Sequence, residues 1–360
     1  MPSSSPSALL ESLVTRDYPI AQEQWGDFWE RLRGRELHDG EALAVVSSLT
    51  SRLPDAPSIA AMLRSLRASN PAPLPPDGTT VNIVGTGGGP STFNLSTASA
   101  FVAASAGARV IKTGSRAYAS RTGSIDLLER LGVPLTSSWE QTETMLDTFN
   151  IACAGPFVYP KELRLLARNI LPFGMKTVGR FFNVIGPFLA AVPVSMQITG
   201  VSDHSLLPTF RELAALDPTK RMWLCANELG ADELLSIVDS EVFDSERGET
   251  FTLAPRELGL GGGSFEDLLP ARELDATVEH FLTLLGGNGP TAALQSIQLN
   301  AAALIVNGGI AQEWPHALEL AGETLRSGEA TRLIERIRNH ETQAPAAALP
   351  GLTTSDQPRG

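Results

Sequence analysis

The stretch Val84-Gly-Thr-Gly-Gly-Gly-Pro-Ser-Thr-Phe-Asn-Leu-Ser-Thr97 carries the strongest structural signal in this sequence. It follows an apolar run at 81–85 that predicts a buried strand, and it leads into small residues that predict a helix at 97–106. Glycines let the backbone approach an anion closely, and free NH groups at a helix N-terminus point towards it. Asn94, Ser96 and Thr97 stand at that N-terminus. The stretch therefore indicates a phosphate-binding turn. A plain tight turn is the alternative, because the spacing matches neither the dinucleotide-binding nor the P-loop pattern.

The rest of the chain alternates between predicted strands and predicted helices. Four further apolar runs have the composition of buried strands, at 108–114, 151–159, 195–201 and 221–228. Predicted helices near 97–106, 124–132 and 205–216 separate these runs. Strands that alternate with helices pair in parallel through right-handed crossovers. The sequence therefore predicts an α/β fold with a mainly parallel central sheet flanked by helices.

The ends of the chain differ from this α/β part. Apolar residues at helical spacing, among them Trp25, Phe28 and Trp29, predict a helical domain before the first strand. A proline-rich segment then predicts a linker. The expected divisions are a disordered start (1–8), a helical domain (9–70), a linker or hinge (71–78), an α/β domain (79–340) and a disordered tail (341–360).

Composition excludes several classes of function. The net charge of −12 argues against nucleic acid as a partner. No apolar run reaches the roughly 18 residues that a membrane span needs, and the first residues lack the pattern of a signal peptide. Cys153 and Cys225 lie in apolar runs, which predicts buried free thiols in a reducing compartment. We therefore expect a cytoplasmic protein without a membrane partner.

Two further segments carry charged side chains next to predicted strands. Residues 112–124 place Lys112, one of only four lysines, near Arg116 and Arg121 and among several hydroxyls. Such a loop favours a phosphate clamp, with an exposed basic loop as the alternative. Asp232 and Glu233 follow the strand predicted at 221–228. Adjacent carboxylates at a strand end can hold Mg²⁺, although such a pair on the surface is the alternative.

Together with FFNVIGP (181–187) and LNAAALIVNGG (299–309), these segments resemble the anthranilate phosphoribosyltransferase family, which is related to the pyrimidine nucleoside phosphorylases. The resemblance extends over roughly residues 9–338. It implies the nucleoside phosphorylase/phosphoribosyltransferase fold, in which a small N-terminal helical domain is hinged to a larger α/β domain. Part of 160–195 would pack on the helical domain. It also implies a homodimer through the helical domain.

The resemblance implies Mg²⁺-dependent transfer of 5-phosphoribosyl from phosphoribosyl pyrophosphate (PRPP), with release of pyrophosphate. It assigns PRPP binding to Gly85, Gly88, Thr92, Asn94, Ser96, Thr97, Lys112, Ser120 and Ser124. It assigns Mg²⁺ to Ser96, Asp232 and Glu233, and catalysis to Lys112, Asp232 and Glu233. Physically, the departing pyrophosphate gains negative charge, which metal ions and preorganised NH donors stabilise.

This sequence departs from the family pattern mostly on the acceptor side. The family's metal-binding aspartate is Gly89, and its histidine and asparagine after the conserved lysine are Thr113 and Ser115. The arginine that binds the carboxylate of anthranilate is replaced by Gly174. Losing such a charge-assisted pair removes about 1.5–3 kcal/mol of binding free energy. The acceptor pocket expected here is Gly85, Thr113, Ser115, Tyr118, Arg168 and Gly174, and Arg164, Arg168, Lys176 or Arg180 could supply a replacement cation.

We therefore predict a small aromatic acceptor other than anthranilate, as in specialised metabolism. Three alternatives stay open. One is the anthranilate phosphoribosyltransferase of tryptophan biosynthesis with a rearranged pocket. Another is an enzyme like the pyrimidine nucleoside phosphorylases, although their Lys-His-Ser-Thr-Gly-Gly start is absent and residues 82–86 read NIVGT. The last is a non-catalytic homologue that binds a ligand.

Overall fold

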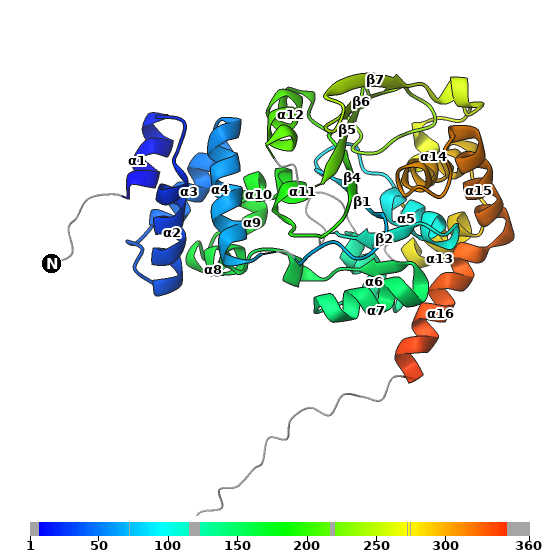
Figure 1. Cartoon of the computed structure of the whole chain (residues 1–360), viewed down its shortest axis with the longest axis horizontal. Helices are drawn as coiled ribbons and strands as arrows, with labels where there is room; N and C mark the ends of the chain where they lie inside the picture. Colours follow the sequence, from blue (N-terminus) through cyan, green and yellow to red (C-terminus); the bar gives the residue numbers. More distant parts are fainter. Residues whose placement is uncertain are drawn as a thin grey trace, which may run out of the picture.

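The computed structural model describes residues 7–71, 73–114, 123–216, 220–271, 273 and 275–343. Within them the chain forms a helical part at one end and a larger α/β part at the other (Figure 1). This confirms the predicted fold class, a small N-terminal helical domain beside a larger α/β domain. In the described residues no helix has the length and apolarity to cross a membrane.

A single seven-stranded sheet organises the α/β part, in the order β3-β2-β1-β4-β5-β6-β7. Its strands are β1 (Thr80–Gly85), β2 (Arg109–Lys112), β3 (Ile151–Cys153), β4 (Met196–Gly200), β5 (Arg221–Asn227), β6 (Ser240–Asp244) and β7 (Glu249–Leu253). The first five pair in parallel, while β6 and β7 are antiparallel. The predicted mainly parallel sheet is confirmed.

The hairpin of β6 and β7 was not predicted. Its side chains are polar or charged at many positions, and four of the five residues of β7 are exposed. A strand at the solvated edge of a sheet has no continuous apolar run to mark it in the sequence. The left-handed Gly248, with φ +67°, closes the turn between the two strands.

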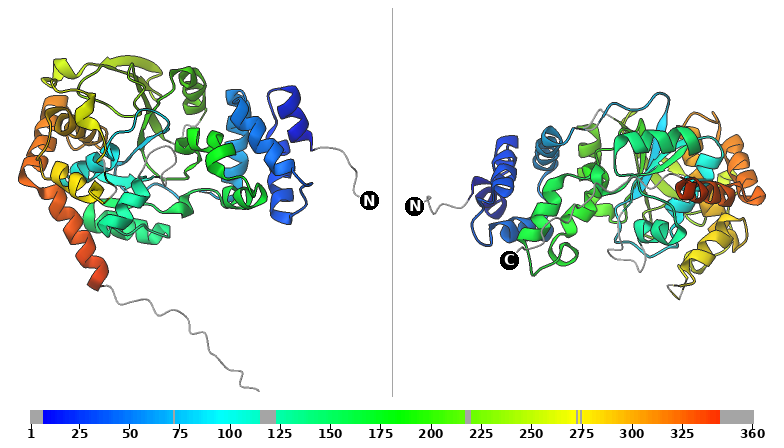
Figure 2. Two further views of the ribbon diagram at one scale, coloured as in Figure 1. Left: turned by 180° about the vertical axis from the view of Figure 1, so that it is seen from behind. Right: turned by 90° about the horizontal axis from the view of Figure 1, so that it is seen from below.

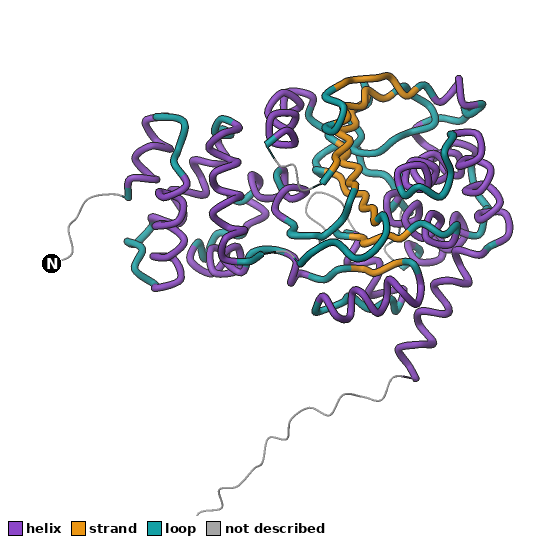
Figure 3. The backbone as a smooth tube through the Cα atoms, in the orientation of Figure 1, coloured by secondary structure: helices purple, strands orange, loops and turns teal. Residues whose placement is uncertain are grey.

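Helices cover both faces of the sheet, as the purple and orange tubes show (Figure 3). They are α5 (Leu95–Ser105), α6 (Ser124–Leu131), α7 (Trp139–Phe149), α12 (Leu207–Ala215), α13 (Thr277–Leu285), α14 (Thr291–Asn307), α15 (Trp314–Ser327) and α16 (Glu329–Gln343). Short 3-10 turns lie at η2 (His204–Leu206), η3 (Pro255–Leu258) and η4 (Phe265–Leu268). Adjacent residues of β5 belong to different cores. Trp223 lies in the core that contains residues of α5 and α14, and Leu224 lies in the core that contains residues of α12. The sheet therefore separates two hydrophobic cores.

The helical part combines segments that are distant in sequence (Figure 2). It contains α1 (Ala8–Thr15), α2 (Gln22–Gly34), α3 (Glu41–Ser51) and α4 (Ala56–Ser69), joined by α8 (Lys161–Asn169), α9 (Met175–Val178), α10 (Arg180–Val184) and α11 (Gly186–Leu189). Trp25 and Trp29 are fully buried and stacked, with their ring centroids 6.2 Å apart. They share one core with Leu166 and Phe181 of the later helices.

The run predicted as a strand at 151–159 is only partly one. Strand β3 ends at Cys153, and the 3-10 turn η1 (Pro156–Val158) follows. The proline fixes its own φ and lacks an NH for the ladder, so the strand cannot continue through it. Cys153 and Cys225 are both free and buried, as predicted. Because β3 is parallel to β2, it ends at the carboxyl edge of the sheet, and η1 follows there.

Candidate functional site

A cavity of about 470 Å³ lies at the carboxyl ends of the parallel strands. Crevices outside this edge of an α/β sheet are the usual ligand sites of such folds. The loops after β1, β2 and β5 line one side of the cavity, and α8 to α11 of the helical part line the other. The cavity therefore joins the two parts of the molecule.

The glycine-rich turn after β1 forms the edge of the cavity. Gly87 and Gly88 have φ angles of +68° and +87°, which favour glycine. The NH of Thr86 donates to the carbonyl of Gly200 at 3.0 Å, and the NH of Gly87 donates to Oδ2 of Asp232 at 2.7 Å. The turn is thus held against β4 and against the loop after β5. Helix α5 begins directly behind it, as predicted.

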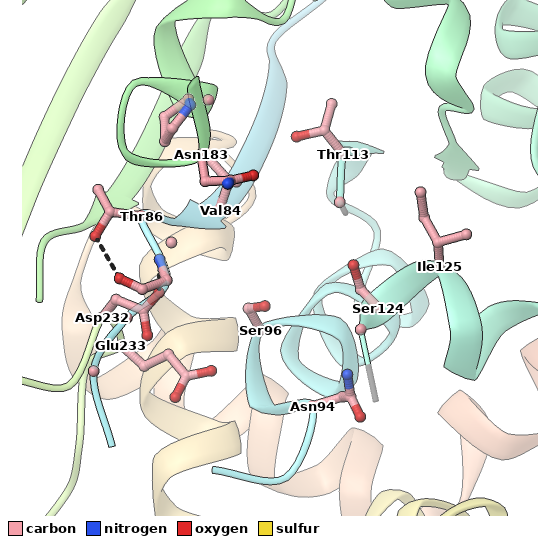
Figure 4. Close-up of a pocket in the computed structure, with 18 of the residues that line it drawn as sticks. Val84, Thr86, Asn94, Ser96, Thr113, Ser124, Ile125, Asn183, Asp232 and Glu233 are labelled. Carbon is pink, nitrogen blue, oxygen red and sulfur yellow. Dashed lines mark hydrogen bonds between the residues drawn. The ribbon is translucent and has the colours of Figure 1, made fainter. Parts of the chain in front are cut away.

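Asp232 and Glu233 lie on one side of the cavity, and Ser124 and Ile125 lie on the other (Figure 4). Thr92 Oγ1 donates to Oε2 of Glu233 at 2.6 Å. Burial raises the pKa of both carboxyl groups. The neighbouring charge of Asp232 adds to this at Glu233, whose pKa reaches about 8. Two crowded carboxylates of this kind favour a divalent cation, which offsets both their desolvation and their mutual repulsion.

Lys112 ends β2 and lines the same cavity, with only 3% of its surface exposed. Its Nζ donates to the carbonyl of Thr113 at 2.6 Å. Burial lowers its pKa to about 8, against the opposing influence of Cys153, Glu233 and Asp232. Below about pH 8 the ammonium group of Lys112 is therefore charged, and it can donate a charge-assisted hydrogen bond to a phosphate in the cavity.

The helical side of the cavity is apolar. Its lining side chains are Pro156, Tyr159, Leu163, Met175, Phe182 and Leu189. The hydroxyl of Tyr159 donates to the carbonyl of Gly114 at 3.3 Å, and burial raises its pKa to about 12. Tyr159 therefore stays neutral. Asn183, labelled in Figure 4, adds an amide to this wall.

Most of the residues singled out from the sequence line this cavity. They are Gly85, Gly88, Thr92, Asn94, Ser96, Lys112, Thr113, Ser124, Asp232 and Glu233. Thr97 does not line the cavity, and its side chain is fully buried. Successive residues of a helix point about 100° apart, so Ser96 faces the cavity while Thr97, the next residue, faces the core. Ser115, Tyr118 and Ser120 lie outside the described residues.

Arg168 and Gly174 do not line the cavity, and both are exposed. Leu163 of α8 faces the cavity, and Arg168, five residues later, lies about 140° further round the helix. Arg164, Lys176 and Arg180 are absent from the wall as well. Among the described lining residues, Lys112 carries the one basic side chain.

Sequence reasoning did not single out the apolar wall as part of the site. Tyr159, Met175 and Phe182 are ordinary core candidates by composition, and only the fold brings them to the cavity. Asn183 had a signal, because it lies inside FFNVIGP, a segment that carries the family resemblance. A polar residue in an otherwise apolar motif could have identified it.

Comparison with known proteins agrees with this geometry. Residues 77–331 match the family model described as "Glycosyl transferase family, a/b domain". The anthranilate phosphoribosyltransferase of Bacillus pumilus is 31% identical over 91% of this chain and 96% of its own length. The solved structure of the Thermus thermophilus enzyme of that name has a TM-score of 0.77 and 27% identity, over 92% of this chain and 98% of its own.

A third relative, known from a solved structure, also has a similar fold. The anthranilate phosphoribosyltransferase of Saccharomyces cerevisiae, solved in complex with PRPP and Mg, has a TM-score of 0.74 and 23% identity. The match covers 94% of this chain and 99% of the yeast one. With a family model matched over more than half of its length, this chain belongs to the anthranilate phosphoribosyltransferase family of glycosyltransferases.

Proposed function

We propose that this protein transfers 5-phosphoribosyl from PRPP to a small aromatic acceptor, in a Mg²⁺-dependent reaction that releases pyrophosphate. The observation that carries the proposal is the division of one cavity into a polar and an apolar half. Glycine NH groups, Lys112 and the carboxylate pair form the polar half, and Tyr159, Met175 and Phe182 belong to the apolar half. The yeast relative solved with PRPP and Mg supports the donor and the metal.

The donor half has the groups that a leaving pyrophosphate needs. Asp232 and Glu233 would hold Mg²⁺, whose charge stabilises the pyrophosphate as it leaves. Their raised pKa values and their shared cavity fit a divalent cation. The glycine turn supplies backbone NH donors, and Lys112 supplies a charge-assisted hydrogen bond. Ser96 would complete the set of oxygen ligands from the first turn of α5.

The acceptor half would position an aromatic ring and exclude water. Flat apolar side chains such as Phe182 and Tyr159 pack against a ring and hold it close to C1 of the ribose. Water is the competing nucleophile in such a reaction, and an apolar wall keeps it out. No side chain on this wall needs to take part in bond breaking.

The names of the curated relatives favour anthranilate as the acceptor over any other compound. Our prediction of a different acceptor receives no support from them and stays a prediction. One feature of the cavity favours it as a second candidate. Anthranilate carries a carboxylate, yet the described apolar wall holds no arginine or lysine to pair with one. An acceptor in which the carboxylate is replaced by a neutral group would fit that wall better.

A pyrophosphate-release assay tests both candidates. The protein is incubated with PRPP and Mg²⁺, and with anthranilate or its neutral amide analogue, 2-aminobenzamide. Aminobenzoates, hydroxybenzoates and nucleobases complete the panel. Efficient release of pyrophosphate with anthranilate supports the anthranilate phosphoribosyltransferase of tryptophan biosynthesis. Faster release with 2-aminobenzamide than with anthranilate supports an acceptor other than anthranilate.

Two other outcomes would replace the proposal. Phosphate-dependent cleavage of pyrimidine nucleosides, without PRPP-dependent release, would indicate a phosphorylase. Binding of PRPP without turnover on any acceptor would indicate a ligand-binding homologue. The homodimer that we predict through the helical part is tested separately, by light scattering of the full chain during size-exclusion chromatography.

A further inference from the structure

Ser202 lies two residues after the end of β4, between the two loops that form the donor half of the cavity. In the sheet, β4 lies between β1 and β5, and the three strands run in parallel. The glycine turn follows β1, and the Asp232–Glu233 loop follows β5. Ser202 itself does not line the cavity. It therefore supports the glycine turn from the side away from the ligand.

The side chain and backbone of Ser202 both bond to the glycine turn. Its hydroxyl donates to the carbonyl of Gly87 at 2.6 Å, and its NH donates to Oγ1 of Thr86 at 3.2 Å. A Cβ atom at Gly89 would lie 3.1 Å from the Cβ of Ser202. The turn is therefore packed against Ser202 as well as hydrogen-bonded to it.

The bond to Gly87 fixes the orientation of the next peptide group. The peptide between Gly87 and Gly88 is planar and trans, so its carbonyl and its NH point in opposite directions. The carbonyl points to Ser202, and the NH of Gly88 therefore points away, on the side where the cavity lies. This NH has no hydrogen-bond partner among the described residues.

Without the hydroxyl of Ser202, the carbonyl of Gly87 would keep only a long hydrogen bond of 3.4 Å from Oγ1 of Thr86. Gly87 and Gly88 both have positive φ angles and no Cβ, so the peptide between them can rotate at low steric cost. The NH of Gly87 is held by Asp232, and of the two hydroxyls that donate to the carbonyl of Gly87, Ser202 makes the short bond of 2.6 Å. An NH donor contributes most to anion binding when it is already aimed at the anion.

We propose that Ser202 is a positioning residue for the donor substrate, because it orients the Gly87–Gly88 peptide and presents the NH of Gly88 to a phosphate group. The inference rests on the proposed function for the identity of the donor. Its direct consequence concerns any pyrophosphate group bound with Mg²⁺ in this half of the cavity. It assigns no role to Ser202 in the binding of the acceptor.

The test compares Ser202→Ala with Ser205→Ala in the full-length protein. Ser205 lies three residues further on, is exposed, and bonds only to Asp203 within its own turn. Losing the hydroxyl of Ser202 removes the short bond to Gly87 and the longer contact of 3.3 Å with Oγ1 of Thr86. The loosened peptide corresponds to about a fivefold to tenfold loss of affinity. We expect the KM for PRPP and the Kd of Mg²⁺-pyrophosphate, measured by calorimetry, to rise by that factor in Ser202→Ala. The kcat and the KM for the acceptor stay within about twofold, and Ser205→Ala behaves as the wild type.

Two results would overturn the inference. One is a Ser202→Ala protein whose pyrophosphate Kd and PRPP KM match those of the wild type. The other is a parallel loss in donor KM, acceptor KM and thermal stability, which would reveal a general structural role. The calorimetric arm does not need turnover. A wild type that binds Mg²⁺-pyrophosphate but transfers nothing would contradict the proposed function while still testing Ser202.

Discussion

The backbone of Asp232 lies so close to Gly200 that a Cβ atom at residue 200 would overlap the carbonyl group of Asp232. Gly85 has a similar relationship to the same residue, because a Cβ there would overlap Oδ2 of the Asp232 side chain. Strands β1 and β4 thus end in glycines that pair with each other in the sheet. The loop after β5 can cross both strand ends only because neither carries a side chain there.

Gly200→Ala is expected to displace Asp232. The added methyl group cannot be accommodated without moving backbone, so we expect a loss of about 1–3 kcal/mol in unfolding free energy. Mg²⁺-dependent pyrophosphate release should fall with it. Gly26→Ala is the control, because a Cβ there meets only Ser65 Oγ at 3.8 Å. Thermal unfolding and the release assay give both readouts, and an unchanged Gly200→Ala protein would contradict the close contact.

Gly89→Asp restores the residue that the family carries at this position, yet we expect it to lower activity. A Cβ at residue 89 would overlap the carbonyl oxygen of Gly230, so the turn would have to move away from the carboxylate loop. We expect at least a tenfold lower kcat/KM for PRPP, about 1.4 kcal/mol. Gly89→Ala should share most of that loss, since the Cβ causes it. A Gly89→Asp protein more active than the wild type would show that the turn rearranges freely.

Asp232→Asn should separate stability from activity. Burial raises the pKa of Asp232 above its unfolded value of 3.8. Ionising Asp232 therefore costs more free energy in the folded protein than in the unfolded chain. This difference destabilises the folded protein as the pH rises above 3.8. Asparagine removes the cost and can still accept from the NH of Gly87. At pH 7.5 without Mg²⁺ we expect unchanged or higher thermal stability, with at least a 100-fold loss of Mg²⁺-dependent turnover. Glu228→Gln, an exposed carboxylate in the same loop, is the control and should retain activity.

Lys112 should set the alkaline limit of activity. Burial lowers its pKa from 10.5 to about 8, so its charge is present below that pH and is lost as pH rises through it. At saturating Mg²⁺, kcat/KM for PRPP is therefore expected to fall above about pH 8. Lys112→Met should lower kcat/KM by roughly 10- to 100-fold at pH 7, the value of a charge-assisted hydrogen bond, and should flatten the fall.

Lys176→Met serves as the matched control for Lys112, because Lys176 is exposed and does not line the cavity. Its pH profile should follow that of the wild type. A Lys112→Met protein that keeps the alkaline fall would mean that another group titrates there.

The sequence by itself determined the five parallel strands of the sheet, and it predicted most of the residues that we propose for the donor half of the cavity. These features depend on local patterns. Apolar runs mark buried strands, and a glycine cluster before small residues marks a tight strand–helix junction. Adjacent carboxylates after a strand are able to hold a cation, and the same pair also occurs on solvated surfaces. Lys112, Asp232 and Glu233 were singled out as charged residues beside predicted strands, and the family resemblance assigned them to the donor site. The structure brings them to one cavity.

Only the tertiary structure decided the rest, because it depends on contacts between residues far apart in the chain. Gly87 meets Asp232 across 145 positions and Ser202 across 115. No local pattern encodes that the hydroxyl of Ser202 donates to the carbonyl of Gly87. Nor does a local pattern encode that residue 200 must lack a side chain because the loop with Asp232 packs against it. The apolar wall arises in the same way: the chain turns out of the sheet at Pro156, and α8 to α11 pack on the N-terminal helices beside the strand ends. Where distant segments meet is set by packing of the whole chain, and that packing gave Tyr159 and Phe182 a place in the site.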